Sequence, residues 1–164
     1  MTNSPRTSTP SDLSNTFRVL IVEDEHLYGY AIARELERHD IPCDLAMTAA
    51  EGLQYARTNL YNAIILDHKL PDDDGISIIP LLLSHQSSTS VIVMTAYETI
   101  KNAIHAIRLG AEDYLVKETS VKPIVAKVLE IRRRDDIRKS HSDWKDQKNG
   151  ILLGESSGIR RVIE

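Results

Sequence analysis

The chain has 164 residues, of which 41% are hydrophobic and 27% are charged, and its net charge is −4. This composition is typical of one folded domain with appended segments and excludes a chain that is disordered throughout. The lack of an apolar run of about 18 residues predicts no membrane span, and a lone cysteine and the absence of a secretory signal predict a cytoplasmic protein.

The charge is unevenly distributed along the chain. Residues 122–145 hold eight Lys and Arg against four Asp and Glu, whereas the rest of the chain is acidic. An acidic body argues against a general nucleic-acid binder, so we expect no nucleic-acid contact by this chain.

The first segment, residues 1–16, is rich in Ser, Thr and Pro and has little to bury, which predicts a flexible tail. From Phe17 onward, short apolar runs alternate with segments of helical period. The five runs that we predict as strands are 18–22, 43–46, 63–66, 90–94 and 113–116. This alternation predicts an α/β fold, a doubly wound five-stranded parallel sheet with five helices, of the flavodoxin-like type.

Local signals support the predicted helices. Thr48 and Glu51 have the spacing of a capping box at the start of the second helix, and Gly110 stands where a C-terminal cap ends the fourth. Pro80 weakens the third helix, because a proline in a helix interior removes a hydrogen bond and kinks it. The fifth helix begins near Ser120 and continues as a charged helical linker.

Polar side chains follow four of the predicted strands. Glu23 and Asp24 come after the first, Asp67 after the third, Thr95 after the fourth and Lys117 after the fifth. In a parallel sheet these ends lie along one edge, where ligands bind. Three neighbouring carboxylates repel one another unless a cation is present, and oxygen ligands suit Mg²⁺. The ammonium of the lysine suits a phosphoryl oxygen. Any one of these residues alone is more often a cap, a packing group or a solvated charge.

Four stretches of the sequence resemble the receiver domain of two-component response regulators. They are Val-Leu-Ile-Val-Glu-Asp-Glu (19–25), Ile-Ile-Leu-Asp-His-Lys-Leu-Pro-Asp-Asp-Asp-Gly (64–75), Val-Met-Thr-Ala-Tyr (93–97) and Gly-Ala-Glu-Asp-Tyr-Leu-Val-Lys (110–117). The resemblance covers residues 17–134. It implies a signalling switch, not an enzyme, that takes a phosphoryl group from a sensor histidine kinase.

The resemblance assigns roles to the acidic residues. It implies that Asp67 accepts the phosphoryl group and that Asp24, Asp67 and the carbonyl of Lys69 bind Mg²⁺. Glu23 would act through a water molecule on the metal.

Further roles follow from the same resemblance. Thr95 and Lys117 would contact the phosphoryl oxygens, Ala96 would keep the entrance open, and Tyr114 would change rotamer with Thr95 on activation. Lys69 and Tyr97 would border the path of a hydrolytic water, so we expect them to prolong the phosphorylated state, unless both point into solvent.

Three features depart from the family pattern or add to it. Glu118 follows Lys117 where the family has proline, so the peptide is either strained in cis or follows a trans path. Residues 72–74 are three consecutive Asp, which we interpret as solvated residues of a turn before Gly75. We interpret His68 as a neighbour of Asp67, not as a second phosphoryl carrier.

The C-terminal part predicts a longer regulator. Residues 135–149 are the predicted linker. We expect the chain to form a homodimer through the face of the fourth helix, fifth strand and fifth helix, extended by this linker. Residues 150–164 are similar to the opening of the AAA+ ATPase domain in sigma-54-dependent (NtrC-like) transcriptional activators. The chain has no Gly-x-x-x-x-Gly-Lys-Ser/Thr loop, so it is not itself that ATPase. Contacts with DNA and sigma-54 RNA polymerase are expected only of a full-length protein.

Other classes fit less well. A stand-alone receiver that works by protein contact stays open. A haloacid-dehalogenase-like phosphatase also uses a strand-end Asp with Mg²⁺, but it wants a second Asp where this chain has Lys69. A flavodoxin-like cofactor binder needs hydroxyls or glycines where this chain has Glu23, Asp24 and Glu25.

Overall fold

The computed structural model describes residues 16–86 and 88–163, with side chains described as far as residue 148. The chain divides into two compact units at residue 128. The tail predicted for residues 1–16 falls almost wholly outside the described residues.

The first unit contains a five-stranded parallel sheet in the order β2-β1-β3-β4-β5. This confirms the doubly wound, flavodoxin-like fold that the alternation of the sequence predicts. The elements are β1 (Val19–Val22), α2 (His26–Glu37), β2 (Cys43–Ala46), α3 (Ala49–Thr58), β3 (Ala63–Asp67), a 3₁₀ turn η1 (Ile76–Ile78), α4 (Ile79–His85), β4 (Ser90–Thr95), α5 (Ile100–Arg108), β5 (Asp113–Val116) and α6 (Lys122–Ile163).

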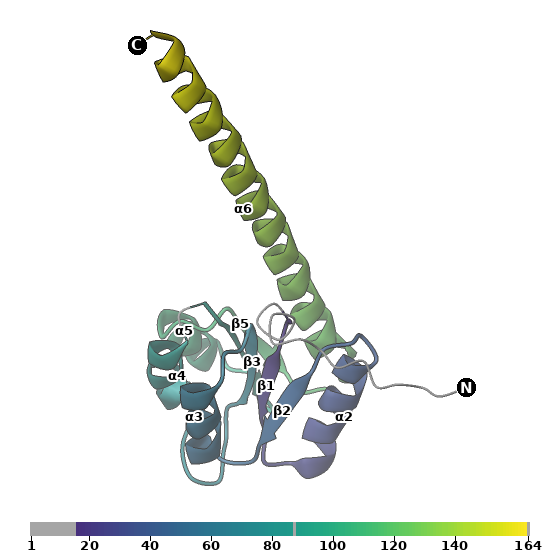
Figure 1. The fold of residues 1–164 in the computed structure, drawn as a ribbon. Coiled ribbons are helices and arrows are strands. Elements are labelled where there is room, and N and C mark those ends of the chain that lie inside the picture. Colours follow the sequence, from purple (N-terminus) through teal and green to yellow (C-terminus); the bar gives the residue numbers. More distant parts are fainter. Residues whose placement is uncertain (1–15, 87, 164) are drawn as a thin grey trace, which may run out of the picture. The chain divides into compact units, whose positions relative to one another are not determined.

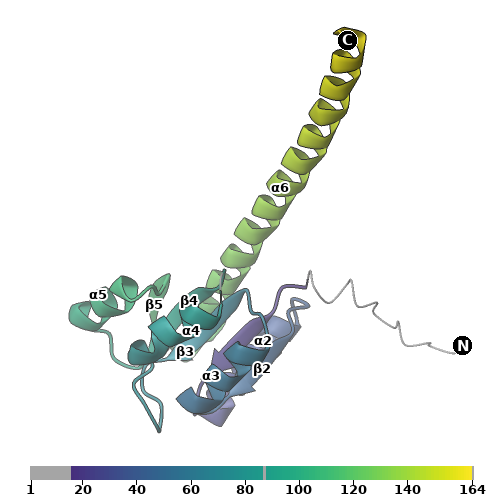
Figure 2. The same ribbon diagram turned by 60° about the vertical axis from the view of Figure 1, so that its left-hand side comes forward.

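Helices cover both faces of the sheet. Figure 1 shows α3, α4 and α5 on one face and α2 on the other, and the turned view in Figure 2 shows the same layers. The central strands β1 and β3 are buried at every position, as strands covered on both sides should be. This double burial explains why their sequences are apolar throughout and do not alternate.

Side-chain caps fix where two helices begin. The hydroxyl of Thr48 accepts the N–H of Glu51 at 3.1 Å, and that of Thr99 accepts the N–H of Asn102 at 3.1 Å. The carboxylate of Glu51 turns back and accepts the N–H of Met47, which completes a box close to the predicted one.

The structure tests two predictions about glycine and proline in the helices. Gly110 follows α5 with a φ of +114°, a left-handed conformation that favours glycine, so it ends the helix as predicted. Pro80 lies in the first turn of α4, after the 3₁₀ turn, where its missing N–H removes no helical bond. The third helix is therefore split before Pro80 and not kinked at it.

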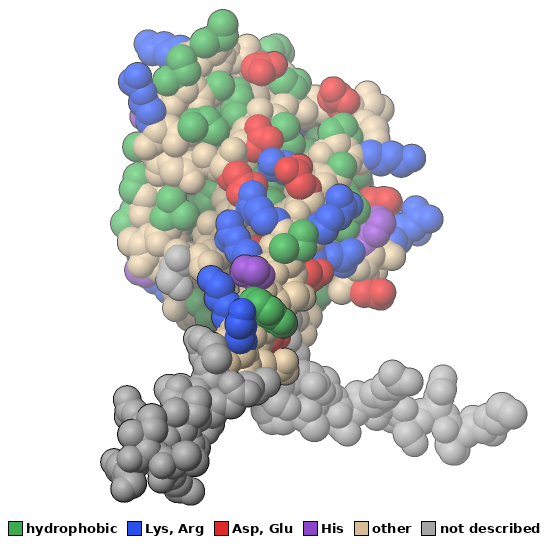
Figure 3. Space-filling model, turned by 90° about the horizontal axis from the view of Figure 1, so that it is seen from above, with side chains coloured by type: hydrophobic (Ala, Val, Ile, Leu, Met, Phe, Trp, Pro, Cys, Tyr) green, Lys and Arg blue, Asp and Glu red, His purple; other side chains and the backbone are tan. Residues whose placement is uncertain are grey.

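The last helix, α6, begins with Pro123 in its first turn, and its backbone stays helical to Ile163. Lys and Arg side chains gather along its described part (Figure 3). The boundaries predicted at residues 134 and 149 both fall within this helix, so the division into a linker and a following module stays a prediction. Within the described residues, no helix combines the length and apolarity needed to cross a membrane.

Candidate functional site

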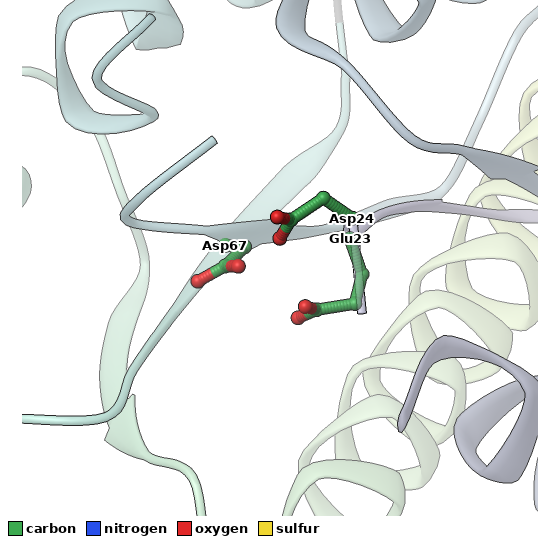
Figure 4. A group of neighbouring side chains, drawn as sticks. All are labelled: Glu23, Asp24 and Asp67. Atoms are coloured by element: carbon green, nitrogen blue, oxygen red, sulfur yellow. The ribbon is translucent and has the colours of Figure 1, made fainter. Parts of the chain in front are cut away.

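The acidic cluster lies at the carboxyl ends of β1 and β3. The strand order reverses between these two strands, and ligands of doubly wound sheets bind at this point. Figure 4 shows the side chains of Glu23, Asp24 and Asp67 converging there, and one oxygen of each lies within 4.8 Å of the others. Glu23 and Asp67 are buried, while Asp24 is exposed. The structure therefore brings together the three carboxylates that the sequence predicts.

Lys117 reaches this cluster from the end of β5. Its Nζ lies 2.7 Å from Oε2 of Glu23 and 3.1 Å from Oδ2 of Asp67. The ammonium also stands over the ring of Tyr28, 5.1 Å from its centroid. The peptide between Lys117 and Glu118 is trans, since no cis peptide occurs among the described residues. The departure from the family pattern at Glu118 thus leaves the ammonium at the cluster.

The electrostatics of the cluster favour an added cation. Burial raises the pKa of Glu23 to about 7, against a smaller lowering by Lys117. Burial likewise raises the pKa of Asp67. Burial acts to lower the pKa of Lys117, but its hydrogen bond to Glu23 and the charge of Asp67 outweigh burial and raise that pKa. One ammonium does not balance three carboxylates, so the donor set fits a divalent cation that prefers oxygen.

The loop after β3 folds back against the backbone of Asp67 and His68. Gly75 donates its N–H to the carbonyl of His68 at 2.7 Å, and Leu70 donates to the carbonyl of Asp73 at 3.2 Å. A methyl group at Gly75 would lie only 2.0 Å from the carbonyl oxygen of Asp67. The φ of Gly75 is −59°, which any residue adopts, so space and not conformation requires glycine here.

Sequence reasoning missed one part of the Asp run. Asp73 and Asp74 do accept N–H groups of their own turn, from Asp74 and Ile76. Asp72 instead accepts the N–H groups of Ala49 and Ala50, at 2.8 and 3.0 Å, at the start of α3. These two hydrogen bonds lower the pKa of Asp72. The loop beside the site is thus tied to a helix 22 and 23 residues away in sequence, which no local pattern indicates.

Thr95 and Tyr114 form a second group beside the cluster. Both are buried, and both direct a hydroxyl to the carbonyl of Tyr97, Thr95 at 3.0 Å and Tyr114 at 3.5 Å. The hydroxyl of Thr95 also accepts the N–H of Tyr97 at 3.2 Å. The pair predicted as a switch therefore shares one acceptor in this structure.

The two residues predicted to affect lifetime lie at the surface. Lys69 is exposed in the loop after β3, where it pairs with Asp74 in an isolated antiparallel bridge. The side chain of Tyr97 is 78% exposed, and the neighbouring Ala96 is exposed as well. To shield Asp67, Tyr97 would have to turn inward.

The fold and its strand-end site define a class of protein. The fold is similar to that of a CheY-like receiver domain protein from Methanospirillum hungatei, with a TM-score of 0.69 and 24% identity over 74% of this chain and 98% of that one. A family model described as the response regulator receiver domain matches residues 19–129. The chain belongs to this family.

Individual relatives agree with this assignment. The chain is 36% identical over 117 residues to the transcriptional regulatory protein CusR of Escherichia coli, covering 71% of this chain and 52% of CusR. It is 31% identical to the acid tolerance regulatory protein ActR of Rhizobium meliloti, covering 68% of this chain and 58% of ActR. The chain thus spans little more than half the length of these relatives.

Two solved structures bear on the site. One is a response regulator from Burkholderia pseudomallei, described with a phosphorylated aspartic acid and a calcium ion, with a TM-score of 0.64 and 28% identity over 74% of each chain. The other is the beryllofluoride-activated NtrC4 receiver domain dimer, with a TM-score of 0.65 and 29% identity over 70% of this chain and 94% of that one.

Proposed function

We propose that Asp67 accepts a phosphoryl group from a sensor histidine kinase in a Mg²⁺-dependent reaction. The observation that carries this proposal is the convergence of Glu23, Asp24 and Asp67 at one strand edge with the ammonium of Lys117 3.1 Å from Asp67. Phosphoryl transfer needs mainly positioning and charge neutralisation, and this arrangement provides both. The chain is on this account a signalling switch and not an enzyme.

In the proposed reaction, an oxygen of Asp67 attacks the phosphorus and the bond from phosphorus to the histidine nitrogen breaks. The nitrogen keeps the electron pair, and an acyl phosphate forms on Asp67. Lys117 lies where it neutralises charge on a phosphoryl oxygen. Burial excludes water from Asp67, which strengthens each of these charge interactions.

The carboxylates of Asp24 and Asp67 and the carbonyl of Lys69 are the proposed ligands of Mg²⁺, and Glu23 acts through a bound water. Mg²⁺ keeps several waters and takes one or two carboxylates, which this set matches. When bound, the ion neutralises phosphoryl charge and orients the oxygens. The calcium ion described for the Burkholderia structure supports a divalent cation.

We expect Asp24→Ala to weaken Mg²⁺ binding by about tenfold or more, because it removes a proposed direct ligand. The free energy of unfolding should change by less than about 0.5 kcal/mol, since Asp24 is exposed. Calorimetric titration with MgCl₂ measures the first effect and urea unfolding the second. Glu25→Ala removes the next exposed carboxylate and should bind Mg²⁺ as the parent chain does; equal losses in both variants would contradict the ligand assignment.

Activation is proposed to act through Thr95 and Tyr114. A phosphoryl group on Asp67 adds acceptor oxygens that attract the hydroxyl of Thr95. When Thr95 turns toward them, the carbonyl of Tyr97 loses one of its two donors. The shared acceptor therefore couples the hydroxyl of Thr95 to the position of Tyr114.

We further propose that the chain is part of a cytoplasmic sigma-54-dependent activator in which it controls an AAA+ module. The motif in residues 150–164 and the similarity to the NtrC4 receiver support this reading. CusR and ActR are described as regulatory proteins without this subtype, so a different output module or a stand-alone receiver is the alternative. Contacts with DNA and with sigma-54 RNA polymerase belong to the full-length protein alone.

A homodimer through α5, β5 and α6 is also proposed. On α5, Ile100, Ile104 and Ile107 are exposed, and on α6, Ile137 and Trp144 are exposed two helical turns apart. We expect the full chain to associate more tightly than a chain ended at Arg134, because the shorter chain lacks the exposed Ile137 and Trp144. Sedimentation equilibrium over a wide concentration range measures this. Equal association of both chains would rule out α6 as a dimerisation element.

The lifetime of the acyl phosphate tests the roles of Lys69 and Tyr97. If either side chain hinders the hydrolytic water, Tyr97→Ala or Lys69→Asn should accelerate loss of phosphate, and misalignment by about 1 Å can change such a rate about 100-fold. Decay is followed by intact mass in Mg²⁺ without a partner protein. The same decay rate in both variants and the parent chain would show that neither Lys69 nor Tyr97 sets the lifetime of the acyl phosphate.

A further inference from the structure

The backbone of His68, the first residue of the loop after β3, is hydrogen-bonded on both sides. Its N–H donates to the carbonyl of Met94 at 2.8 Å, and its carbonyl accepts the N–H of Gly75 at 2.7 Å. Its side chain is buried although it directly follows Asp67 and precedes the exposed Lys69. The backbone of His68 is therefore fixed on both sides, and its imidazole lies buried between the loop and the neighbouring strands.

The two ring nitrogens of His68 face different groups. Nε2 lies 3.5 Å from Oδ1 of Asp74, and Nδ1 lies 3.5 Å from Oγ1 of Thr95. A neutral imidazole has one N–H donor and one acceptor nitrogen, and a carboxylate can only accept. The contact with Asp74 therefore favours the tautomer with hydrogen on Nε2, which leaves Nδ1 as an acceptor facing Thr95.

This acceptor competes for the single hydroxyl proton of Thr95. The proton points to the carbonyl of Tyr97 at 3.0 Å, with Nδ1 of His68 as a second, longer acceptor. The edge of the His68 ring also meets the ring of Tyr114, with centroids 6.4 Å apart and an interplanar angle of 64°. One side chain thus contacts both residues of the proposed switch.

We propose that His68 is a positioning residue that holds Thr95 and Tyr114 in the unphosphorylated arrangement. To reach a phosphoryl oxygen on Asp67, the hydroxyl of Thr95 must leave both of its present acceptors. His68 therefore lowers the fraction of chains in the activated arrangement and with it the affinity for a phosphoryl group. This inference rests on the proposed function, because it assumes that Asp67 carries that group.

Three substitutions distinguish the contacts made by the two ring nitrogens of His68 from the packing of its ring. His68→Phe keeps a ring beside Tyr114 and removes both nitrogens. His68→Asn places a carboxamide near the position of Nδ1 and keeps a partner for Thr95, whereas His68→Gln places it near Nε2 and keeps only the partner for Asp74. Packing alone would make Phe the mildest change, while the inference makes Asn the mildest.

The experiment titrates each variant of the full chain with beryllofluoride in Mg²⁺ and follows the γ-methyl signal of Thr95 by NMR. We expect His68→Phe and His68→Gln to bind beryllofluoride about two- to threefold more tightly than the parent chain, the lower end of what one hydrogen bond contributes, because the contact spans 3.5 Å. Their Thr95 signal without beryllofluoride should lie displaced toward the bound position. His68→Asn should stay close to the parent chain in both readouts.

Unchanged affinity and an unmoved Thr95 signal in all three variants would overturn the inference while leaving the proposed function intact. A loss of affinity in step with the thermal midpoint of unfolding would overturn it as well, since a packing role predicts that result. A parent chain that binds no beryllofluoride, with Asp67→Asn indistinguishable from it, would overturn the proposed function and the inference together.

Discussion

Asp67→Asn is expected to abolish the gain of one phosphoryl group when the chain is incubated with acetyl phosphate and Mg²⁺. The amide is uncharged, and its carbonyl oxygen is too weak a nucleophile for the attack on phosphorus. Other carboxylates of the loop lie in turns, where Asp73 and Asp74 accept backbone N–H groups. Among the described residues no ion pair joins Asp73 or Asp74 to a lysine, whereas Nζ of Lys117 lies 3.1 Å from Asp67.

Intact mass spectrometry measures this result directly. Asp73→Asn is the matched control, because it changes an exposed acid of the same loop and should label as the parent chain does. Persistent labelling of Asp67→Asn at the parent rate would show that another residue is the acceptor. Fast turnover of phosphomonoesters by the parent chain would favour the phosphatase class instead.

Gly75→Ala is expected to have the largest effect among substitutions outside the acidic cluster. The added methyl group would lie 2.0 Å from the carbonyl oxygen of Asp67, and backbone cannot yield as a flexible side chain does. Overpacking of this kind costs about 1–3 kcal/mol of the free energy of unfolding, and the loop must move away from β3. Because the displaced atom belongs to Asp67 itself, labelling by acetyl phosphate should fall at least tenfold.

Gly29→Ala provides a matched control for this glycine. Gly29 lies in helix α2, and its added methyl group would meet Cδ1 of Leu45 at 3.3 Å, the end of a flexible side chain. It would also lie 3.5 Å from Cβ and Cγ of Glu23, an ordinary van der Waals distance that requires no shift of the acidic cluster. Alanine is favoured over glycine in a helix by about 1 kcal/mol, so stability should change little or rise. Urea unfolding and labelling rates compare the two variants. If Gly75→Ala unfolds and labels like Gly29→Ala, the close approach to Asp67 does not constrain the site.

The sequence alone was sufficient to predict the sheet, because the central strands are buried on both faces and leave distinct apolar runs, and the edge strands follow from the alternation with helices. Strands β2 and β5 have the predicted bounds, and β3 and β4 extend one residue further, to Asp67 and Thr95. The carboxyl ends of parallel strands meet at one edge, so the same reasoning also predicts the acidic cluster.

Contacts between distant segments could not be predicted in the same way. Nothing in the order of residues indicates that Asp72 caps α3 or that His68 faces Thr95, since both depend on how a loop folds back over the sheet. A shift of the helix start by one turn moves Pro80 from the interior of the third helix to its first turn, and the sequence does not indicate which of the two occurs. The roles of Lys69 and Tyr97 stay predictions, because the structure describes both as exposed.

Chemical trapping of the phosphorylated residue tests the central claim most directly. Borohydride reduces an acyl phosphate of aspartate to homoserine and leaves free carboxylates unchanged, so it marks the acceptor in the unaltered chain. After incubation with acetyl phosphate and Mg²⁺, reduction and digestion, tandem mass spectrometry should find homoserine at position 67 and aspartate at 24 and 72–74. Removal of Mg²⁺ should abolish the product. Homoserine at any other position, or none despite a gain of one phosphoryl group, would contradict the assignment of Asp67 as the acceptor.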